Sequence, residues 1–550
     1  MHRHILKYSW VMFLFPSLTT FGQAQLPRLV KSQTATQLYV DEQAYLICGG
    51  ELGNSTATTL ENMQSVWPDL AALHLNTVLV PVYWELVEPQ EGKFDFSLYQ
   101  QLILEARQYQ MKIIFLWFGA WKNSMSSHAP SWVKLDQNRF PRAQDEQGIS
   151  QEILSCFSAE ALAADQNALQ AFMTFLKETD ESEHTVIMVQ VENEIGMLPS
   201  ARDHQELAER AFKSPVPSEL MNYLTTKKEQ LVPELITFWE TNGLKNHGTW
   251  EEVFGQSKAT DEVFMAWHYA RFVDELARTA KAVYPLPLYV NAALNRPGWE
   301  PGQYPSAGPL PHLMDIWQAA APNLDFLAPD FYFPDFQLWC DRYTRQKNIL
   351  FVPEHRFDET VSAKALFSIA HYHGLGFSPF SIESKTNPGD EHLSDLYGMI
   401  QNISTLLSEA IAHGKVDGVL LDKAHQESIL YMGNYELTCR HDYTLPWTPG
   451  ATTENWPTTS VAVIQTGEDS FFIAGTGVVI TFKIKDDATQ RVGLLKVDEG
   501  RFEGDEWHIT RHLNGDQTHQ GSMSDYLPEQ QVFSGFPSIG IARLNKLVVG

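Results

Sequence analysis

Two glutamates stand where apolar runs of the sequence give way to loops. The run at 185–192 continues into Asn193-Glu194, and the run at 349–354 ends at Glu354. If both runs are strands of one parallel sheet, their carboxyl ends share an edge and the two carboxylates can face each other. Such a pair suits glycoside cleavage, because one carboxyl protonates the leaving oxygen while the other attacks or stabilises the oxocarbenium-like centre. Two solvated loop carboxylates are the alternative interpretation.

The elements that must position this pair are short runs rich in β-branched and aromatic residues. Eight of them alternate with longer helical patterns between about residues 40 and 385, which is typical of a parallel sheet in an α/β protein. Eight strand–helix units fit a (β/α)8 TIM barrel, with the longest insertion between the fourth and fifth strands; an open doubly wound sheet is the alternative. The predicted strands are 45–51, 77–84, 112–120, 185–192, 288–292, 325–331, 349–354 and 375–383.

The pattern of apolar and polar residues changes beyond about residue 430. Alternating segments rich in threonine and glycine, such as 460–465 and 478–485, replace the strand–helix pattern. Alternation of this kind predicts strands with one buried face. We therefore expect a barrel over residues 25–430 and an all-β, sandwich-like accessory domain over residues 431–550.

The first 24 residues are predicted to be a signal peptide. Arg3 and Lys7 precede an apolar stretch, and Gly22-Gln23-Ala24 is a small-x-small cleavage site. A membrane anchor, the alternative, needs about 20 uninterrupted apolar residues, whereas Pro16 breaks this segment. We expect export to the periplasm or the extracellular space, and no integral membrane segment after cleavage.

Composition narrows the choice of partner. The chain has 40 basic and 67 acidic residues, for a formal net charge of −27. A field of this sign repels nucleic acid and anionic lipid, so a neutral ligand is expected, and the glutamate pair suggests that this ligand is a carbohydrate; homo-oligomerisation is left open. No nucleotide, zinc or other cofactor motif is written in the chain, so we expect no metal and no cofactor. Four widely spaced cysteines, expected as buried free thiols with disulfides as the alternative, are Cys48, Cys156, Cys340 and Cys439.

Several short segments together resemble a known clan of enzymes. Gly49-Gly50-Glu51, the segment 76–96 with its Glu88-Pro89, Asn193-Glu194 and Val352-Pro353-Glu354 look like a clan A glycoside hydrolase. More narrowly, the chain is similar to β-galactosidases of glycoside hydrolase family 35, in the bacterial branch with a C-terminal β domain. Family 42 is the nearest neighbour.

The resemblance implies roles for particular residues. Glu194 would be the general acid/base and Glu354 the nucleophile of a retaining, double-displacement mechanism. Asn193 would donate to the 2-hydroxyl of the sugar, and Tyr332 would hydrogen-bond the nucleophile. By parity with Glu194 along the strand, Glu192 is expected to be an ion-pair or supporting residue rather than a catalytic one.

Two loops depart from family 35. Val87 stands where the family has a histidine, and 118–123 replaces the family's usual third-strand signature. The residues predicted to bind the sugar are therefore chosen as polar or aromatic groups at strand ends. In addition to Asn193 they are Glu51, Trp84, Trp121, Asn123, Asn291, Tyr332 and Glu383.

These inferences lead to one expected function and its alternatives. The chain is expected to be a secreted, retaining, exo-acting β-galactosidase that removes terminal galactose from plant-type oligosaccharides or polysaccharide side chains. Another clan A glycosidase, such as an arabinopyranosidase or an endo-β-glycanase, is the alternative. A non-catalytic carbohydrate-binding protein on the same fold is a further one, because fold alone does not imply function.

Overall fold

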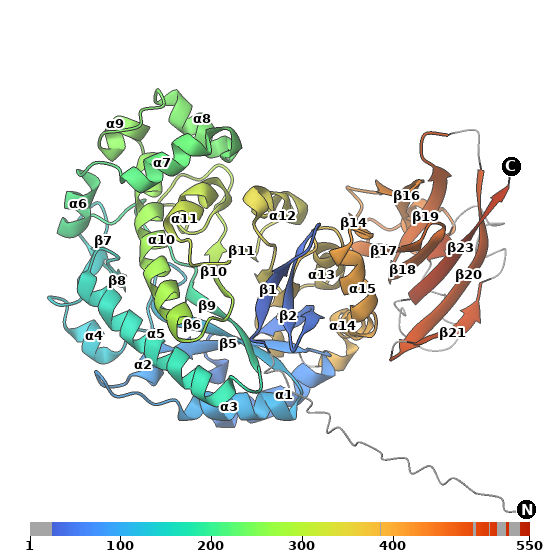
Figure 1. Ribbon diagram of the computed structural model, residues 1–550, viewed down its shortest axis with the longest axis horizontal. Helices are drawn as coiled ribbons and strands as arrows, with labels where there is room; N and C mark the ends of the chain where they lie inside the picture. Colours follow the sequence, from blue (N-terminus) through green and yellow to red (C-terminus); the bar gives the residue numbers. More distant parts are fainter. Residues whose placement is uncertain are drawn as a thin grey trace, which may run out of the picture.

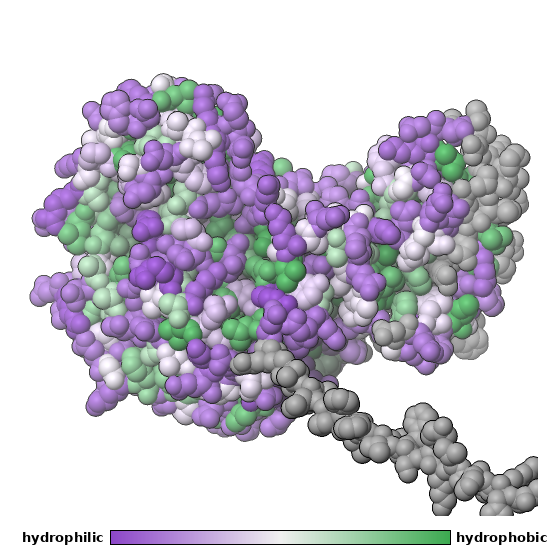
Figure 2. Space-filling view, in the orientation of Figure 1, coloured by the Kyte–Doolittle hydropathy of each residue, from purple (hydrophilic) through white to green (hydrophobic). Residues whose placement is uncertain are grey.

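The computed structural model describes residues 25–385, 387–487, 491–504, 506–513, 524–526 and 540–549 (Figure 1). The predicted signal peptide lies outside these residues. Figure 2 shows two bodies joined at a narrower waist, which are the barrel and the C-terminal β domain. Within the described part of the chain, no helix combines the length and apolar character needed to cross a bilayer.

Eight parallel strands close into a barrel, so the predicted (β/α)8 fold is confirmed. Each predicted strand is a barrel strand, and the order around the barrel follows the order along the chain. The strands are buried on both faces, which is why they read as continuous apolar runs. They are β4 (Ile47–Glu51), β5 (Thr77–Tyr83), β6 (Lys112–Lys122), β9 (Val186–Asn193), β10 (Leu288–Ala293), β11 (Phe326–Phe331), β12 (Val352–His355) and β13 (Gly376–Pro379).

Helices surround the barrel, and several begin at clear sequence signals. Ser158 and Ser257 cap the two longest helices, their hydroxyls accepting backbone N–H groups three residues on. The longest insertion lies between β9 and β10, as predicted, and holds α6 to α10. The helices are α1 (Leu60–Ala72), α2 (Trp84–Val87), α3 (Ser97–Gln108), α4 (Ser131–Leu135), α5 (Ala159–Asp180), α6 (Glu206–Phe212), α7 (Ser218–Thr226), α8 (Pro233–Thr241), α9 (Trp250–Phe254), α10 (Lys258–Val283), α11 (Met314–Ala320), α12 (Phe336–Tyr343), α13 (Val361–Ala370), α14 (His392–Asn402) and α15 (Ser404–Ala412).

A small antiparallel sheet closes the N-terminal end of the barrel. It consists of β1 (Arg28–Lys31), β2 (Thr36–Val40) and β3 (Gln43–Tyr45). Leu38 and Val40 of this sheet belong to the apolar cluster inside the barrel, together with inward-facing residues of the barrel strands. The opposite end of the barrel is the one where active sites of such barrels lie. A second hairpin, β7 (Arg142–Gln144) with β8 (Ser150–Leu154), lies in the loop after β6.

The C-terminal domain is all β, as predicted, and its two antiparallel sheets pack face to face around one apolar cluster. Its first strand, β14, precedes the predicted boundary at residue 430. One sheet has the order β14-β17-β18-β23-β20-β21 and the other β15-β16-β19-β22. The strands are β14 (Val416–Leu421), β15 (Glu427–Met432), β16 (Tyr435–His441), β17 (Thr459–Gly467), β18 (Ser470–Thr476), β19 (Val478–Ile484), β20 (Arg491–Glu503), β21 (Glu506–His512), β22 (Ser524–Tyr526) and β23 (Gly540–Val549).

The strand β17 contributes side chains to the cores of both bodies. Val461 and Val463 of β17 point into the β domain's core, whereas Ala462 and Ile464 belong to the barrel's main apolar cluster. The β14–β17 part of this sheet is therefore buried on both faces, with α13 of the barrel packed on its outer side. Gly418 of β14 allows the approach, because a Cβ there would lie 2.9 Å from the Cβ of Ala370.

Adding a methyl group at Gly418 tests this close approach. We expect Gly418→Ala to lower the free energy of unfolding by about 1–3 kcal/mol, because the rigid neighbour must shift. Gly398→Ala in α14 is the matched control, since its Cβ would meet only ordinary contacts at 3.6 Å or more. That change should raise stability by up to about 1 kcal/mol. Urea unfolding measures both, and equal effects would contradict the tight junction.

Candidate active site

The two predicted glutamates meet at the open end of the barrel. Glu194 follows β9 and Glu354 lies in β12, and each is at least 95% buried. One carboxylate oxygen of each, and one of Asp330 at the end of β11, all lie within 4.8 Å of one another. Asp330 was not predicted as a site residue. Glu51 on the first barrel strand is also buried, and it lies close enough to Glu354 for the charge of Glu354 to raise its pKa.

Glu194 is held in place by hydrogen bonds with two asparagines. Its backbone N–H donates to Oδ1 of Asn291 (2.9 Å), and Nδ2 of Asn291 donates to Asp330 (2.7 Å). The side chain of Asn123 donates to Oε2 of Glu194 (2.8 Å). Glu194 itself has a φ of +46°, a left-handed conformation that costs about 1–2 kcal/mol for a residue with a side chain. Strain of this kind persists only where the surroundings fix the residue, as they do here.

Burial and like charge keep this cluster partly protonated. Burial, followed by the negative charge of Glu354, raises the pKa of Glu194 to about 7, while Lys122 opposes the rise. The same causes hold the pKa of Asp330 and of Glu51 well above the usual range of a carboxyl group. Carboxyl groups this close cannot all ionise, so at neutral pH the cluster retains protons.

Glu354 has a different environment. The hydroxyl of Tyr332 donates a hydrogen bond to its Oε1. Burial, and then the charge of Glu354, raise the pKa of Tyr332, so the phenol keeps its proton and remains a donor. Oε2 of Glu354 has no partner among the described residues and can face a ligand. The structure thus brings the predicted Tyr332 to the carboxylate that it was expected to contact.

Lys122, which was not predicted as a site residue, supplies the positive charge. Its ammonium donates to Oδ1 of Asn193 (2.7 Å). The amide nitrogen of Asn193 is buried and has no acceptor in the described chain. Because an unpaired buried donor costs about 1–3 kcal/mol, this N–H suits a hydroxyl brought by a ligand.

The two tryptophans predicted to stack on a sugar do not reach the site, so those two predictions are wrong. Trp84 is fully buried and its indole N–H donates to Glu88 (3.0 Å). Trp121 is also fully buried, with its ring centroid 4.8 Å from that of Phe272 on α10. Side chains alternate between the faces of a strand. These tryptophans therefore face the helices, while Tyr83 beside Trp84 faces the barrel interior.

Glu192 and Glu383 accept backbone N–H groups of the segments at the edges of the site. Glu192 accepts the backbone N–H groups of Ala120 (3.3 Å) and Trp121 (2.9 Å), so it fixes the end of β6 and does not join the pair. This agrees with its predicted supporting role. Glu383, after β13, accepts the N–H of Gly53 (3.0 Å) and the hydroxyl of Thr56. It connects the loops after the first and last barrel strands and remains partly exposed.

The cluster of Glu194, Asp330 and Glu354 is also a candidate cation site. Among the described residues, Glu194, Asp330 and Glu354 are the group with carboxylate spacing suited to one. The ammonium of Lys122 lies close enough to lower the pKa of Glu194, and a second positive charge there is unfavourable. The expectation of a site without metal or cofactor stays a prediction. All four cysteines are unpaired, as expected of free thiols.

Comparison with protein families gives two matches. Residues 60–280 match the family model Glyco_hydro_42, described as beta-galactosidase. Residues 393–524 match a domain of unknown function, DUF5597. The clan of the sequence resemblance is confirmed, and the matching model is that of family 42, its nearest neighbour. No curated protein matches the chain significantly.

Solved structures similar to the chain include three bacterial proteins. A β-galactosidase from Bacillus circulans sp. alkalophilus shares 12% identity over 66% of this chain and 57% of its own (TM-score 0.46). A β-galactosidase from Marinomonas ef1 shares 12% over 66% and 61% (TM-score 0.44), and the catalytic domain of a β-amylase from Paenibacillus polymyxa shares 13% over 67% and 100% (TM-score 0.44). The chain thus spans less than two thirds of the length of both β-galactosidases.

The raised pKa of Glu194 predicts how stability depends on pH. The folded state binds this proton more tightly than the unfolded chain, so stability is lost as pH rises from about 4.5 through about 7. Glu194→Gln replaces the titrating carboxyl group with a neutral amide, so this loss of stability with rising pH should disappear. Relative to the natural chain, we expect the variant to gain on the order of 1–3 kcal/mol between pH 5 and pH 8, measured by urea unfolding.

Glu85→Gln is the matched control. His128 lowers the pKa of Glu85 by a hydrogen bond, so this carboxylate favours folding when it is ionised. The variant should be no more stable than the natural chain at any pH from 5 to 8. A pH-independent offset for Glu194→Gln would contradict a raised pKa at Glu194.

Proposed function

We propose that the chain, whose barrel matches the family 42 model over residues 60–280, is a retaining, exo-acting β-galactosidase of glycoside hydrolase clan A. The spacing of the buried pair carries the proposal. Retaining glycosidases have catalytic carboxyl groups about 5–5.5 Å apart, whereas inverting enzymes leave about 6.5–9.5 Å for a water molecule. Oxygens of Glu194 and Glu354 lie within 4.8 Å, which supports retention.

In the first step, Glu354 attacks the anomeric carbon while Glu194 gives its proton to the leaving oxygen. The bond to the leaving group breaks, the aglycone departs as an alcohol, and the sugar is left as an ester on Glu354. A pKa of about 7 lets Glu194 hold this proton at neutral pH. The hydroxyl of Tyr332 orients the attacking carboxylate through its other oxygen.

In the second step, the roles follow from the loss of charge. Once Glu354 is an ester, the negative charge that raises the pKa of Glu194 is gone, so that pKa falls and Glu194 ionises. Glu194 then takes a proton from water, whose oxygen attacks the anomeric carbon and releases Glu354 as a carboxylate. Two inversions at the same carbon give overall retention.

Several features support the substrate class. The net charge of −27 disfavours anionic ligands, and near-complete burial of the pair suits a pocket for a chain end rather than an open cleft. The matched family model is described as beta-galactosidase, which favours galactose over arabinopyranose. Plant-type oligosaccharides as the source and export by residues 1–24 belong to the same proposal, and homo-oligomerisation stays a prediction.

Hydrolysis of a panel of aryl β-glycosides tests the activity. We expect fast release from the β-galactoside, with the β-anomer as the first product by NMR. Glu354→Ala should lower kcat/KM by about 10⁴-fold or more, because the nucleophile is lost. Glu105→Gln is the matched control, since Glu105 is a buried glutamate on α3 that only accepts from Trp67 and Gln101. An intact panel, or an α-anomer as first product, would overturn the proposal.

Rescue by azide distinguishes the roles of the two glutamates, because the two alanine variants should give glycosyl azides of opposite anomeric configuration. In Glu354→Ala, azide can replace the missing nucleophile, and a single displacement gives an α-galactosyl azide. In Glu194→Ala, an activated substrate still forms the ester, and azide attack on that ester gives the β-galactosyl azide. Product configuration is read by NMR. The same anomer from both variants would mean that the assigned roles are wrong.

Replacing Lys122 should shift the pH profile of kcat/KM, an effect that can be distinguished from a loss of rate at all pH values. The value of kcat/KM should fall as pH rises through the pKa of Glu194, about 7, because the acid loses its proton. Lys122→Met removes the charge that lowers this pKa, so the basic limb should move to higher pH. Lys122→Arg, which keeps the charge, should leave the limb near its original position. If the basic limb of the Lys122→Met profile stayed at its original pH, the inference that Lys122 lowers the pKa of Glu194 would be wrong.

A further inference from the structure

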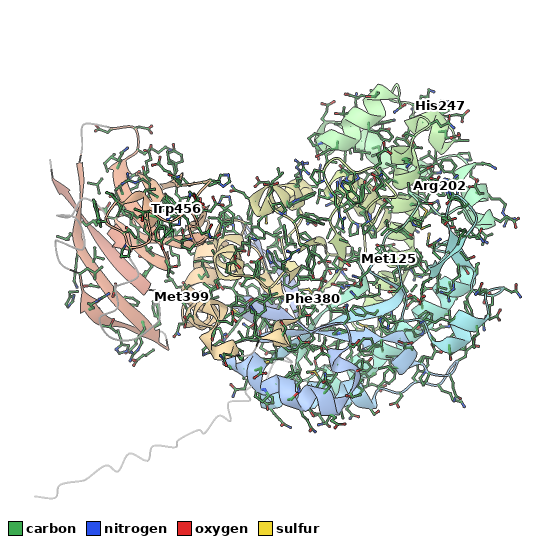
Figure 3. The ribbon with its side chains drawn as sticks, turned by 180° about the vertical axis from the view of Figure 1, so that it is seen from behind. Met125, Arg202, His247, Phe380, Met399 and Trp456 are labelled. Carbon is green, nitrogen blue, oxygen red and sulfur yellow. The ribbon has the colours of Figure 1, made fainter. Side chains whose placement is uncertain are left out.

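A second pocket lies at the junction of the barrel and the C-terminal domain. It has a volume of about 280 Å³ and lies between α13 and α14 on one side and β17, β18 and the turn after β16 on the other. Figure 3 labels Met399 of α14 and Trp456 of the segment before β17, which mark the two sides of this junction. The active-site carboxylates do not line this pocket.

The pocket contains a buried carboxylate that lacks a donor. Asp442 is 2% exposed, and its Oδ1 has no hydrogen-bond partner in the described chain. Nδ1 of His441 lies 3.0 Å away but accepts the backbone N–H of Tyr443, and Nε2 faces the carbonyl of Pro457 at 2.9 Å. In the tautomer that these backbone contacts require, His441 has no proton to give to Asp442.

A buried hydroxyl lines the pocket from the same side as Asp442. Ser460 is 4% exposed and its Oγ has no partner among the described residues. It shares its side of β17 with Ala462 and Ile464, which pack into the barrel's apolar cluster, so its side chain faces the barrel. Leu366 and Leu396 of α13 and α14 supply the apolar part of the wall.

We propose that this pocket binds one neutral pyranose unit of a carbohydrate, a choice of ligand class that rests on the proposed function. A sugar hydroxyl can donate to Asp442 and another can bond Ser460, which removes the cost of two unpaired buried polar groups. The C–H face of a pyranose suits the leucine wall, and the volume is at the small end for ligand pockets. The carboxylates of Asp442 and Glu359 in the lining disfavour an anionic ligand.

Binding stoichiometry tests the proposal. Calorimetric titrations use the full-length Glu354→Gln chain, which is not expected to hydrolyse ligand, with methyl β-galactoside and methyl β-glucoside as probes. We expect two sites per chain for at least one probe. Ser460→Ala and Asp442→Asn in this background should each weaken the second site at least tenfold and leave the first unchanged.

Ser408→Ala is the matched control. Ser408 of α15 is another buried serine whose hydroxyl has no side-chain partner among the described residues, and it does not line the pocket, so both sites should remain. Ser460→Ala removes only an unpaired oxygen, so its thermal midpoint should stay at or above that of its parent. A second site lost equally in Ser408→Ala would contradict the assignment.

Three further outcomes decide the matter. A single glycoside site in every variant would overturn the proposal, whether or not the chain hydrolyses galactosides. Calcium chloride that raises the thermal midpoint of the natural chain but not of Asp442→Asn, with no effect of either glycoside on the second site, would identify a cation site instead. A second site sensitive to Ser460→Ala in a chain that leaves aryl galactosides intact would support this proposal and reject the proposed hydrolysis.

Discussion

The burial of four acidic side chains around one lysine is the constraint on which the site depends. Taking a single carboxylate out of water costs several kcal/mol, and Glu51, Glu194, Asp330 and Glu354 are all at least 95% buried. The cluster persists because protons remain on some of its members and Lys122 offsets part of the charge. The barrel supplies the rest, since eight strands anchored by apolar layers fix the groups against their mutual repulsion.

Much of the fold and the central pair of the site could be predicted from the sequence. Barrel strands buried on both faces leave uninterrupted apolar runs, and a carboxyl at the end of such a run is conspicuous. The N-terminal sheet escaped notice because its strands are short and only partly buried. The pocket at the junction depends on packing between residues far apart in the chain, for which a single sequence offers no local signal.

The remaining site residues were missed for a reason that alternation explains. Trp84 and Trp121 were selected for their aromatic side chains alone. Every second residue of a strand faces the same way, and Leu79 and Phe118 face the barrel interior. The residues on the interior face near the strand ends are therefore Tyr83 and Lys122, not the tryptophans. Asp330 likewise follows Phe326 and Ala328 on the interior face of β11. Assigning a face to each strand before selecting its residues would have corrected all three positions.

The N-terminal sheet also sets the order in which the barrel can be completed. Gln37 in β2 donates to the carbonyl of Ser408 in α15, and Thr34 donates to the carbonyl of Ile411. The earliest described segment of the chain therefore makes these two hydrogen bonds only when the last helices of the barrel exist, whereas its Asp41 pairs with Lys112 and His184 from earlier segments. A ribosome-bound chain shorter than about residue 412 therefore lacks two of the hydrogen bonds that hold the N-terminal sheet, although one partner of each was made at the start.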